Sequence, residues 1–139
     1  MHGPMLSALA DSLQLGSGQE AVWESLALGN LMVALATARH YAYQSVGALG
    51  VIELTAPGRA ELVNAGLKRL GIDGAARRYY ALHATLDVRH SAAWNREVLR
   101  PLVASSPELA PPIAEGALLR LRAGQRCFDR YRQELWGSA

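Results

Sequence analysis

The sequence predicts an all-α fold, and three observations support this prediction. Apolar residues recur at three- and four-residue intervals in most segments of the chain. No segment of useful length alternates apolar and polar residues, as a half-buried strand would. Half of the 139 residues are apolar, which is enough to form a hydrophobic core. We therefore expect residues 1–139 to form a single helical domain.

The first part of the chain predicts helices that are separated by glycine and proline. Residues 4–15 carry leucine and methionine at helical spacing, and a glycine-rich turn at residues 16–18 ends this segment. Residues 19–55 are rich in alanine and leucine and contain internal glycines, so they predict one kinked helix or two successive helices. We expect Pro57 and Gly58 to break the chain, because proline disrupts the preceding helical turn.

The middle of the chain predicts two further helices joined by a tight turn. Residues 59–70 are amphipathic, and the glycines of residues 71–74 provide a stop. Asp73 in this turn is a candidate N-cap for the next helix. That helix is expected to run from about residue 75 to about residue 105, with a bend at Pro101.

Prolines also mark the last connection of the chain. Pro107, Pro111 and Pro112 predict a rigid linker, because their rings fix the backbone and remove hydrogen-bond donors. The residues that follow, 113–136, have the apolar periodicity of a final amphipathic helix.

The composition argues against several classes of protein. Fourteen basic and twelve acidic residues give a formal charge of +2, and this small excess does not indicate a nucleic-acid partner. The single cysteine, Cys127, excludes an intramolecular disulfide and a zinc site built from several thiolates. The apolar stretch at residues 25–38 is shorter than the roughly 20 residues that cross a bilayer. With no export signal visible, we expect a cytoplasmic protein.

Three potential metal ligands lie on one stripe of the predicted helix at residues 75–105. His83, Asp87 and His90 are spaced i, i+4 and i+7, so at about 100° per residue their side chains project in nearly the same direction. Aromatic neighbours extend the stripe, which indicates that this face points inward. Buried imidazoles and a buried carboxylate need partners. A metal ion would satisfy all three, and a hydrogen-bond network in a metal-free structural or interaction protein is the alternative.

Glu53 is a lone carboxylate in an apolar segment. A carboxylate there is a helix-end residue near solvent, an ion-pair partner of a core arginine, or a metal ligand. Helical bundles that hold carboxylate-bridged metal pairs combine a glutamate from one helix with an acidic residue and a histidine three positions apart on another. Asp87 and His90 have this spacing, which favours the ligand role for Glu53.

Simpler roles are expected for the remaining polar residues. His40 is expected to be a polar residue outside the ligand set. Glu115 opens the last helix, where a carboxylate favours the positive end of the dipole. Arg77 and Arg78 fit a solvated turn better than an anion site, and Cys127 is expected to pack in a helix.

The segments YYALHATLDVRHSAAW, REVLRPLV and GALGVIELTAPGR together resemble the haem-oxygenase-like diiron oxidases, also described as iron-containing redox enzymes. The likeness covers roughly residues 30–121. It implies a helical bundle of the haem-oxygenase type, without haem. In this family one helix supplies a glutamate and the next supplies two histidines and an acidic residue. Glu53 matches the former, and His83, Asp87 and His90 match the latter.

The resemblance also involves the start of the chain. An earlier helix of the family supplies a glutamate and a histidine, and His2, which lies 51 residues before Glu53, is the candidate for that histidine. The companion glutamate would precede Met1. We therefore expect the sequence to lack the N-terminal part of the family domain. The apolar surface left uncovered predicts a homo-oligomer.

The function implied by the resemblance is oxidation of a small organic metabolite with O2. The implied cofactor is Fe(II), two ions per site, and manganese accepts the same donors. The alternative is a metal-free helical structural or interaction protein with a degenerate site. A further alternative is cofactorless chemistry of the thiaminase kind, for which Cys127 is the sole candidate nucleophile.

Overall fold

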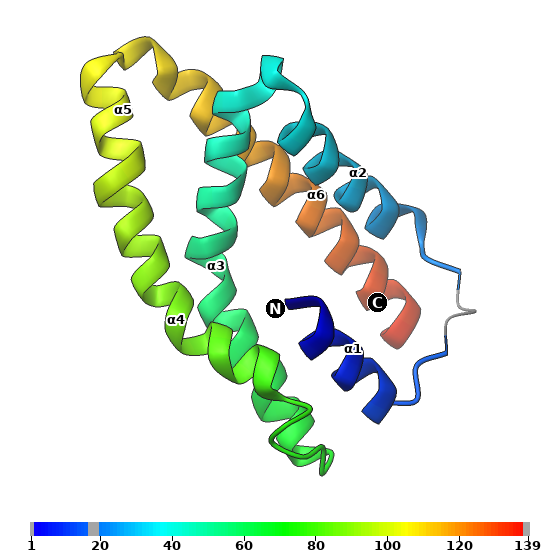
Figure 1. Cartoon of the computed structure of the whole chain (residues 1–139). Helices are drawn as coiled ribbons and strands as arrows, with labels where there is room; N and C mark the ends of the chain where they lie inside the picture. The colour runs from blue at the N-terminus through cyan, green and yellow to red at the C-terminus, as the bar shows by residue number, and fades with distance from the viewer. Residues whose placement is uncertain (1, 17–19, 138–139) are drawn as a thin grey trace. The chain divides into compact units, whose positions relative to one another are not determined.

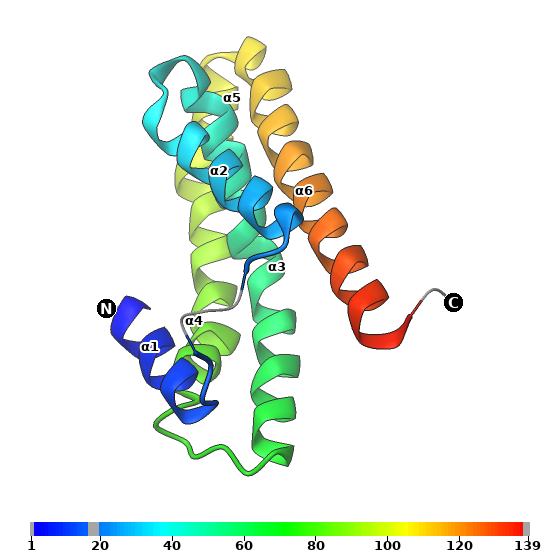
Figure 2. The same cartoon turned by 90° about the vertical axis from the view of Figure 1, so that its right-hand side faces the viewer.

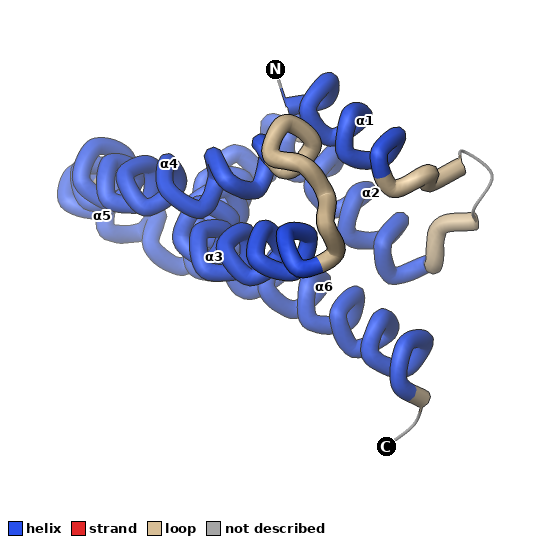
Figure 3. The backbone as a smooth tube through the Cα atoms, turned by 90° about the horizontal axis from the view of Figure 1, so that it is seen from below, coloured by secondary structure: helices blue, strands red, loops and turns tan. Residues whose placement is uncertain are grey.

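The structure is a computed structural model that describes residues 2–16 and 20–137. The helices are α1 (His2–Ser12), α2 (Trp23–Thr37), α3 (Ala42–Arg69), α4 (Arg78–Trp94), α5 (Arg100–Ser105) and α6 (Ala110–Trp136) (Figure 1). Short 3-10 helices at Arg39–Tyr41 and Pro107–Leu109 and a π-helical turn at Asn95–Leu99 connect them. Every regular element in the described ranges is helical, so the predicted all-α fold is confirmed (Figure 3). None of the described helices is long and apolar enough to cross a membrane.

The chain forms two compact units. Unit 1 comprises residues 1–19 and 53–93, and unit 2 comprises residues 20–52 and 94–139. The boundaries fall inside α3 and at the end of α4. Unit 1 therefore contains α1, the second part of α3 and nearly all of α4.

The predicted chain break at Pro57 and Gly58 is wrong. Helix α3 runs without interruption from Ala42 to Arg69, with Pro57 inside it (Figure 2). Proline removes one backbone hydrogen bond, the one to the carbonyl four residues earlier, and this costs about 3 kcal/mol in a helix interior. The chain tolerates that loss because the residues beyond Pro57 pack in unit 1, where Ala60 and Leu67 are buried.

A small apolar core holds unit 1 together. Leu9 of α1 and Leu67 of α3 are buried against Ala76, and the partly buried side chains that pack on this cluster are Leu13, Ile72 and Tyr80. Burial of such side chains stabilises the fold by about 1.5–3 kcal/mol each. The cluster fixes α1 to the turn between α3 and α4.

The turn between α3 and α4 is held by side chains. Gly71 ends α3 with a φ of +76°, which favours glycine. The carboxylate of Asp73 accepts hydrogen bonds from the backbone N–H groups of Ala75 (2.7 Å) and Ala76 (3.1 Å). These bonds have the predicted capping form, but they close the turn at residues 74–77, and α4 begins only at Arg78. Arg77 is partly buried, and its guanidinium donates to the carbonyl of Ile72 (2.8 Å) and to the side chain of Asn64 (2.7 Å), whereas Arg78 is exposed, as predicted for a solvated turn.

Close helix contacts organise unit 2. A Cβ atom added at Gly47 of α3 would collide with the backbone of Ile113 of α6, and one at Gly116 would collide with the backbone of Gln44. These two glycines let α3 and α6 approach each other directly. Glu115 accepts a hydrogen bond from the side-chain amide of Gln44 (3.0 Å), so it joins the two helices rather than only facing a helix end.

The helix predicted over residues 75–105 begins at Arg78 and continues to Ser105, with a π-helical turn just before Pro101. Helix α4 ends at Trp94, the π-helical turn at Asn95–Leu99 follows, and α5 then begins. Pro101 lies in the first turn of α5, directly after the π-helical turn, so the irregular turn lies where proline lacks the N–H of a regular helix. Trp94 directly precedes this irregular turn, and its indole N–H donates a hydrogen bond to the carbonyl of Val46 (3.3 Å).

The last predicted linker is shorter than expected. Only Pro107–Leu109 forms the connection, and Pro111 and Pro112 lie in the first turn of α6, where proline is tolerated. The helix ends at Trp136, where the sequence predicts its end.

Candidate metal centre

Helix α4 presents the predicted row of ligands on one side. Asp87 is 4% exposed and is the one buried charged residue in the part of the chain that the structure describes. His90, one turn further along, has 55% of its side chain exposed. The row is therefore buried at Asp87 and open to solvent at His90, and the prediction of a wholly inward face holds only in part.

Glu53 of α3 meets this row within unit 1. The Nδ1 atom of His90 lies 3.4 Å from an Oε atom of Glu53 and 3.4 Å from an Oδ atom of Asp87. One donor atom from each residue lies within 4.8 Å of the other two. Three residues that the sequence analysis selected as ligands are thus within reach of one ion.

The donor chemistry of this group fits a cation. The buried Oε2 atom of Glu53 accepts no hydrogen bond within the described structure, although it lies near His90. Two carboxylates are close together, and neither of the residues facing Glu53 carries a fixed positive charge. Donor atoms that share one ion at about 2.1 Å lie about 3.0–3.5 Å apart, close to the spacing of His90 from both carboxylates. A small shift of Glu53 or Asp87 would complete this arrangement.

His83 and His2 are not members of the group of Glu53, Asp87 and His90, although His83 lies one helical turn before Asp87 in α4. The Nδ1 atom of His83 is 2.7 Å from the backbone carbonyl of Tyr79, and because a carbonyl only accepts, Nδ1 is the donor and Nε2 is the ring nitrogen left for a metal. The ring of His83 stacks on that of Tyr79, with centroids 4.1 Å apart. The ring of His2 lies edge-on to His83 at 4.9 Å. The two histidines form a second set of potential ligands, separate from the group of Glu53, Asp87 and His90.

Tyr79 is a neighbour of this pair that the sequence analysis did not recognise as a partner of His83. The signal was present, because a residue four positions earlier in a helix places its carbonyl next to the side chain. Burial raises the pKa of the Tyr79 phenol, and the negative charges of Tyr80 and Asp87 raise it further. The phenol therefore keeps its proton well into the alkaline range.

The remaining polar candidates lie elsewhere. The ring of His40 is edge-on to that of Tyr41 at 5.0 Å, in the short 3-10 helix before α3. Cys127 is buried in α6, as expected for a packing residue, and its sulfur lies 3.5 Å from the hydroxyl of Ser25. That hydroxyl also lies 2.6 Å from the phenol oxygen of Tyr131. Neither neighbour is a base that would activate the thiol.

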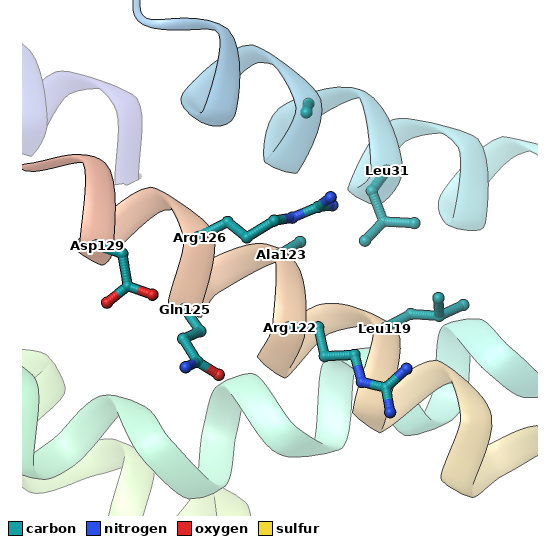
Figure 4. A pocket seen from close by; sticks show the side chains of 8 residues that line it. Leu31, Leu119, Arg122, Ala123, Gln125, Arg126 and Asp129 are labelled. Carbon is teal, nitrogen blue, oxygen red and sulfur yellow. The ribbon is translucent and has the colours of Figure 1, made fainter.

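Unit 2 contains a groove of different chemistry. It has a volume of about 480 Å³ and is lined by Ala27, Leu31, Leu119, Arg122, Ala123, Gln125, Arg126 and Asp129. Figure 4 shows the side chain of Arg126 extending from α6 toward α2, whereas those of Gln125 and Asp129 point away from α2. The lining includes no imidazole and no thiol. This groove therefore offers one carboxylate, that of Asp129, and lacks the imidazole that the group in unit 1 offers to a transition metal.

Comparison with known proteins gives one result that agrees with the chemistry of unit 1. A family model described as iron-containing redox enzyme matches residues 1–125. The matched range is wider than residues 30–121, over which the sequence motifs show the resemblance. The chain has no significant similarity to a curated protein or to a solved structure.

Proposed function

This chain belongs to the family of iron-containing redox enzymes, and we propose that it is a non-haem diiron oxidase or oxygenase. The reaction proposed is O2-dependent oxidation of a small organic metabolite. The observation that carries this proposal is the convergence of Glu53, Asp87 and His90, with a buried Glu53 oxygen that accepts no hydrogen bond.

The first ion would be held by Glu53, Asp87 and His90. Carboxylate and imidazole donors bind both ferrous and ferric iron, and they also accept manganese. Three protein donors leave further positions for water, O2 or substrate. The exposed side of His90 gives these small molecules a route from solvent.

The second ion would be held by His83 and His2. His83 lies one helical turn before Asp87 on the same face of α4, and His2 of α1 lies next to it. Asp87 and Glu53 would supply the carboxylate donors of the site, as in other carboxylate-rich helical bundles.

The residues of the chain have separate tasks in this proposal. Iron, when bound, supplies the one-electron steps that the reduction of O2 requires. The carbonyl of Tyr79 holds the His83 ring with Nε2 free to bind metal, in the way that outer partners orient metal-binding histidines. The phenol of Tyr79 keeps its proton and can donate a hydrogen bond next to His83. The buried position of Asp87 keeps its carboxylate away from bulk water.

Oxygen uptake tests the proposed function. The protein loaded anaerobically with Fe(II) should consume O2 faster than the same concentration of free Fe(II). The Asp87→Ala variant should lose this excess uptake, because it lacks the buried carboxylate. A Glu24→Gln variant, which changes a carboxylate of unit 2, should keep it. Equal uptake by the wild type and Asp87→Ala would contradict the proposal.

We also propose that the protein self-associates. Helix α2 carries a single charged residue, Glu24, and large apolar side chains of its outer stripe are exposed, namely Trp23, Leu26 and Val33. Exposed apolar stripes of this kind mark association surfaces. Light scattering during size-exclusion chromatography should give a mass above 15.0 kDa, and Leu26→Glu should shift it toward the monomer.

A further inference from the structure

A second cavity lies in unit 1, between α1 and the first turns of α4. It has a volume of about 470 Å³ and is lined by His2, Pro4 and Met5 of α1 and by Arg78 and Leu82 of α4. Cavities of about 300–1,000 Å³ are typical of sites for small organic molecules. The cavity is therefore large enough for a short organic compound.

The lining combines apolar surface with one fixed charge. Pro4, Met5 and Leu82 provide the apolar part, and Arg78 is the only acidic or basic residue among the lining side chains apart from His2. Arginine is always charged near neutral pH. An occupant that matches this lining has one anionic group and an apolar body.

The guanidinium of Arg78 is available for such an occupant. In the described part of the chain it forms no side-chain hydrogen bond and no ion pair, whereas the adjacent Arg77 is fully engaged with Ile72 and Asn64. The two arginines of this turn therefore differ in role. Arg77 stabilises the turn, and Arg78 presents an uncompensated charge at the edge of an apolar cavity.

His2 connects the cavity to the metal ligands. Its ring lines the cavity and also lies 4.9 Å from the ring of His83. A molecule in the cavity would thus lie beside the pair of histidines that we assign to the second ion.

We propose that this cavity binds a small organic monoanion, with its anionic group on Arg78 and its apolar body against Met5 and Leu82. The assignment of this molecule as the substrate rests on the function proposed above. Binding itself does not, because no lining residue belongs to the group of Glu53, Asp87 and His90.

The test uses hexanoate as the anionic probe and hexanamide as its neutral counterpart. Both are titrated into protein freed of metal with a chelator, and binding is followed by amide shifts in NMR spectra. The Arg78→Gln variant should weaken hexanoate about tenfold or more, because a charge-assisted bond is lost, and should change hexanamide by less than about twofold. Leu82→Ala should weaken both probes, because it removes apolar contact area from each.

Arg89→Gln is the matched control. Arg89 is an exposed arginine of the same helix, eleven residues beyond Arg78, and it does not line the cavity. This variant loses the same formal charge and should bind both probes as the wild type does. Equal weakening of hexanoate by both substitutions would show general electrostatic attraction and overturn the proposal. Absence of saturable hexanoate binding, or equal affinities for hexanoate and hexanamide, would also overturn it.

The result separates the cavity from the metal centre. Selective hexanoate binding by metal-free protein, together with failure to bind iron, would support the anion-binding cavity and refute the proposed oxidase function. Iron binding without selective hexanoate binding would keep the metal centre and refute the anion cavity. The circular dichroism spectrum of Arg78→Gln, compared with the wild type, shows whether the variant is folded. If it is not, Arg78→Lys tests the same site, because it keeps the charge but loses the forked geometry and should weaken hexanoate less.

Discussion

Units 1 and 2 each bury a glutamate oxygen that accepts no hydrogen bond, but the surroundings of the two oxygens differ. In unit 2, Oε2 of Glu24 lies 4.0 Å from the guanidinium of Arg130, which also pairs with Glu134. In unit 1, Oε2 of Glu53 faces Asp87 and His90 instead. The charge of Glu24 is compensated by the chain, and that of Glu53 has no fixed cation beside it.

This difference separates structural from chemical roles. The polar groups of unit 2 are used in packing, as in the contacts of Gln44 with Glu115 and of Trp94 with Val46. In unit 1 the carboxylates of Glu53 and Asp87 stay close together without such partners. An arrangement of that kind is costly in the absence of a ligand. It is therefore a more informative sign of function than the ion pairs of unit 2.

The largest effect is expected in the packing of unit 2. Gly47→Ala should destabilise the protein by about 3 kcal/mol, because the new methyl group collides with the Ile113 carbonyl. Gly29→Ala is the control, since a Cβ there meets nothing within 4 Å, and it should stabilise the helix by about 0.5–1 kcal/mol. Urea denaturation of both variants measures the difference. Similar stabilities would contradict the close contact between α3 and α6.

The next effect concerns stabilisation of unit 1 by metal. Fe(II) at about 100 times its dissociation constant should raise the free energy of unfolding by about 2.7 kcal/mol. Asp87→Asn should remove this gain, because the amide is a poorer ligand than the buried carboxylate. Anaerobic thermal melts with and without Fe(II) provide the measurement. An unchanged iron effect in Asp87→Asn would exclude Asp87 as a ligand.

Substitutions of the two glutamates should change the stability of the metal-free protein by smaller amounts, and in opposite directions. Glu24→Gln should cost up to about 1 kcal/mol, because it breaks the ion pair with Arg130. Glu53→Gln should leave stability unchanged or raise it, because it removes repulsion with Asp87. Denaturation at pH 8 in the presence of a chelator compares them. A larger loss for Glu53→Gln than for Glu24→Gln would show that Glu53 is already compensated within the chain.

The smallest expected effect is the contribution of Tyr131 in unit 2 to stability at alkaline pH. Its hydrogen bond with Cys127 raises the pKa of the Tyr131 phenol, burial adds to this, and the bond with Ser25 partly opposes it. A raised pKa in the folded state contributes stability that is complete below about pH 10 and is lost as pH rises through the folded value. Above pH 10, the free energy of unfolding of Tyr131→Phe should therefore fall less steeply with pH than that of the wild type, as measured by denaturation. Identical slopes would contradict this role of Tyr131.

Parts of this account follow from the sequence through local geometry. The period of a helix fixes the common direction of His83, Asp87 and His90, so their row on α4 could be predicted from spacing. The cap at Asp73 is equally local. In contrast, the meeting of Glu53 with Asp87 and His90 depends on how α3 packs on α4. It is indicated by the apolar setting of Glu53, by the spacing of Asp87 and His90 and by the family resemblance, and not by helical periodicity alone.

Other features depend on packing that no local rule contains. Proline is a helix breaker in isolation, yet α3 continues through Pro57 because residues beyond it are buried. The exposure of His90 depends on what covers that end of the row. Likewise, Arg77 and Arg78 are adjacent and chemically identical, and the positions of the Ile72 carbonyl and of Asn64 distinguish their roles.

The iron content of the protein tests the central claim most directly. The protein is loaded anaerobically with Fe(II) and desalted, and the ratio of iron to chain is determined by elemental analysis. We predict about two irons per chain for the wild type, as in other carboxylate-rich bundles, and almost none for Asp87→Asn. A wild-type ratio near one would contradict the assignment of a second ion to His83 and His2. A wild-type ratio near zero would contradict the assignment of Glu53, Asp87 and His90 as a metal centre.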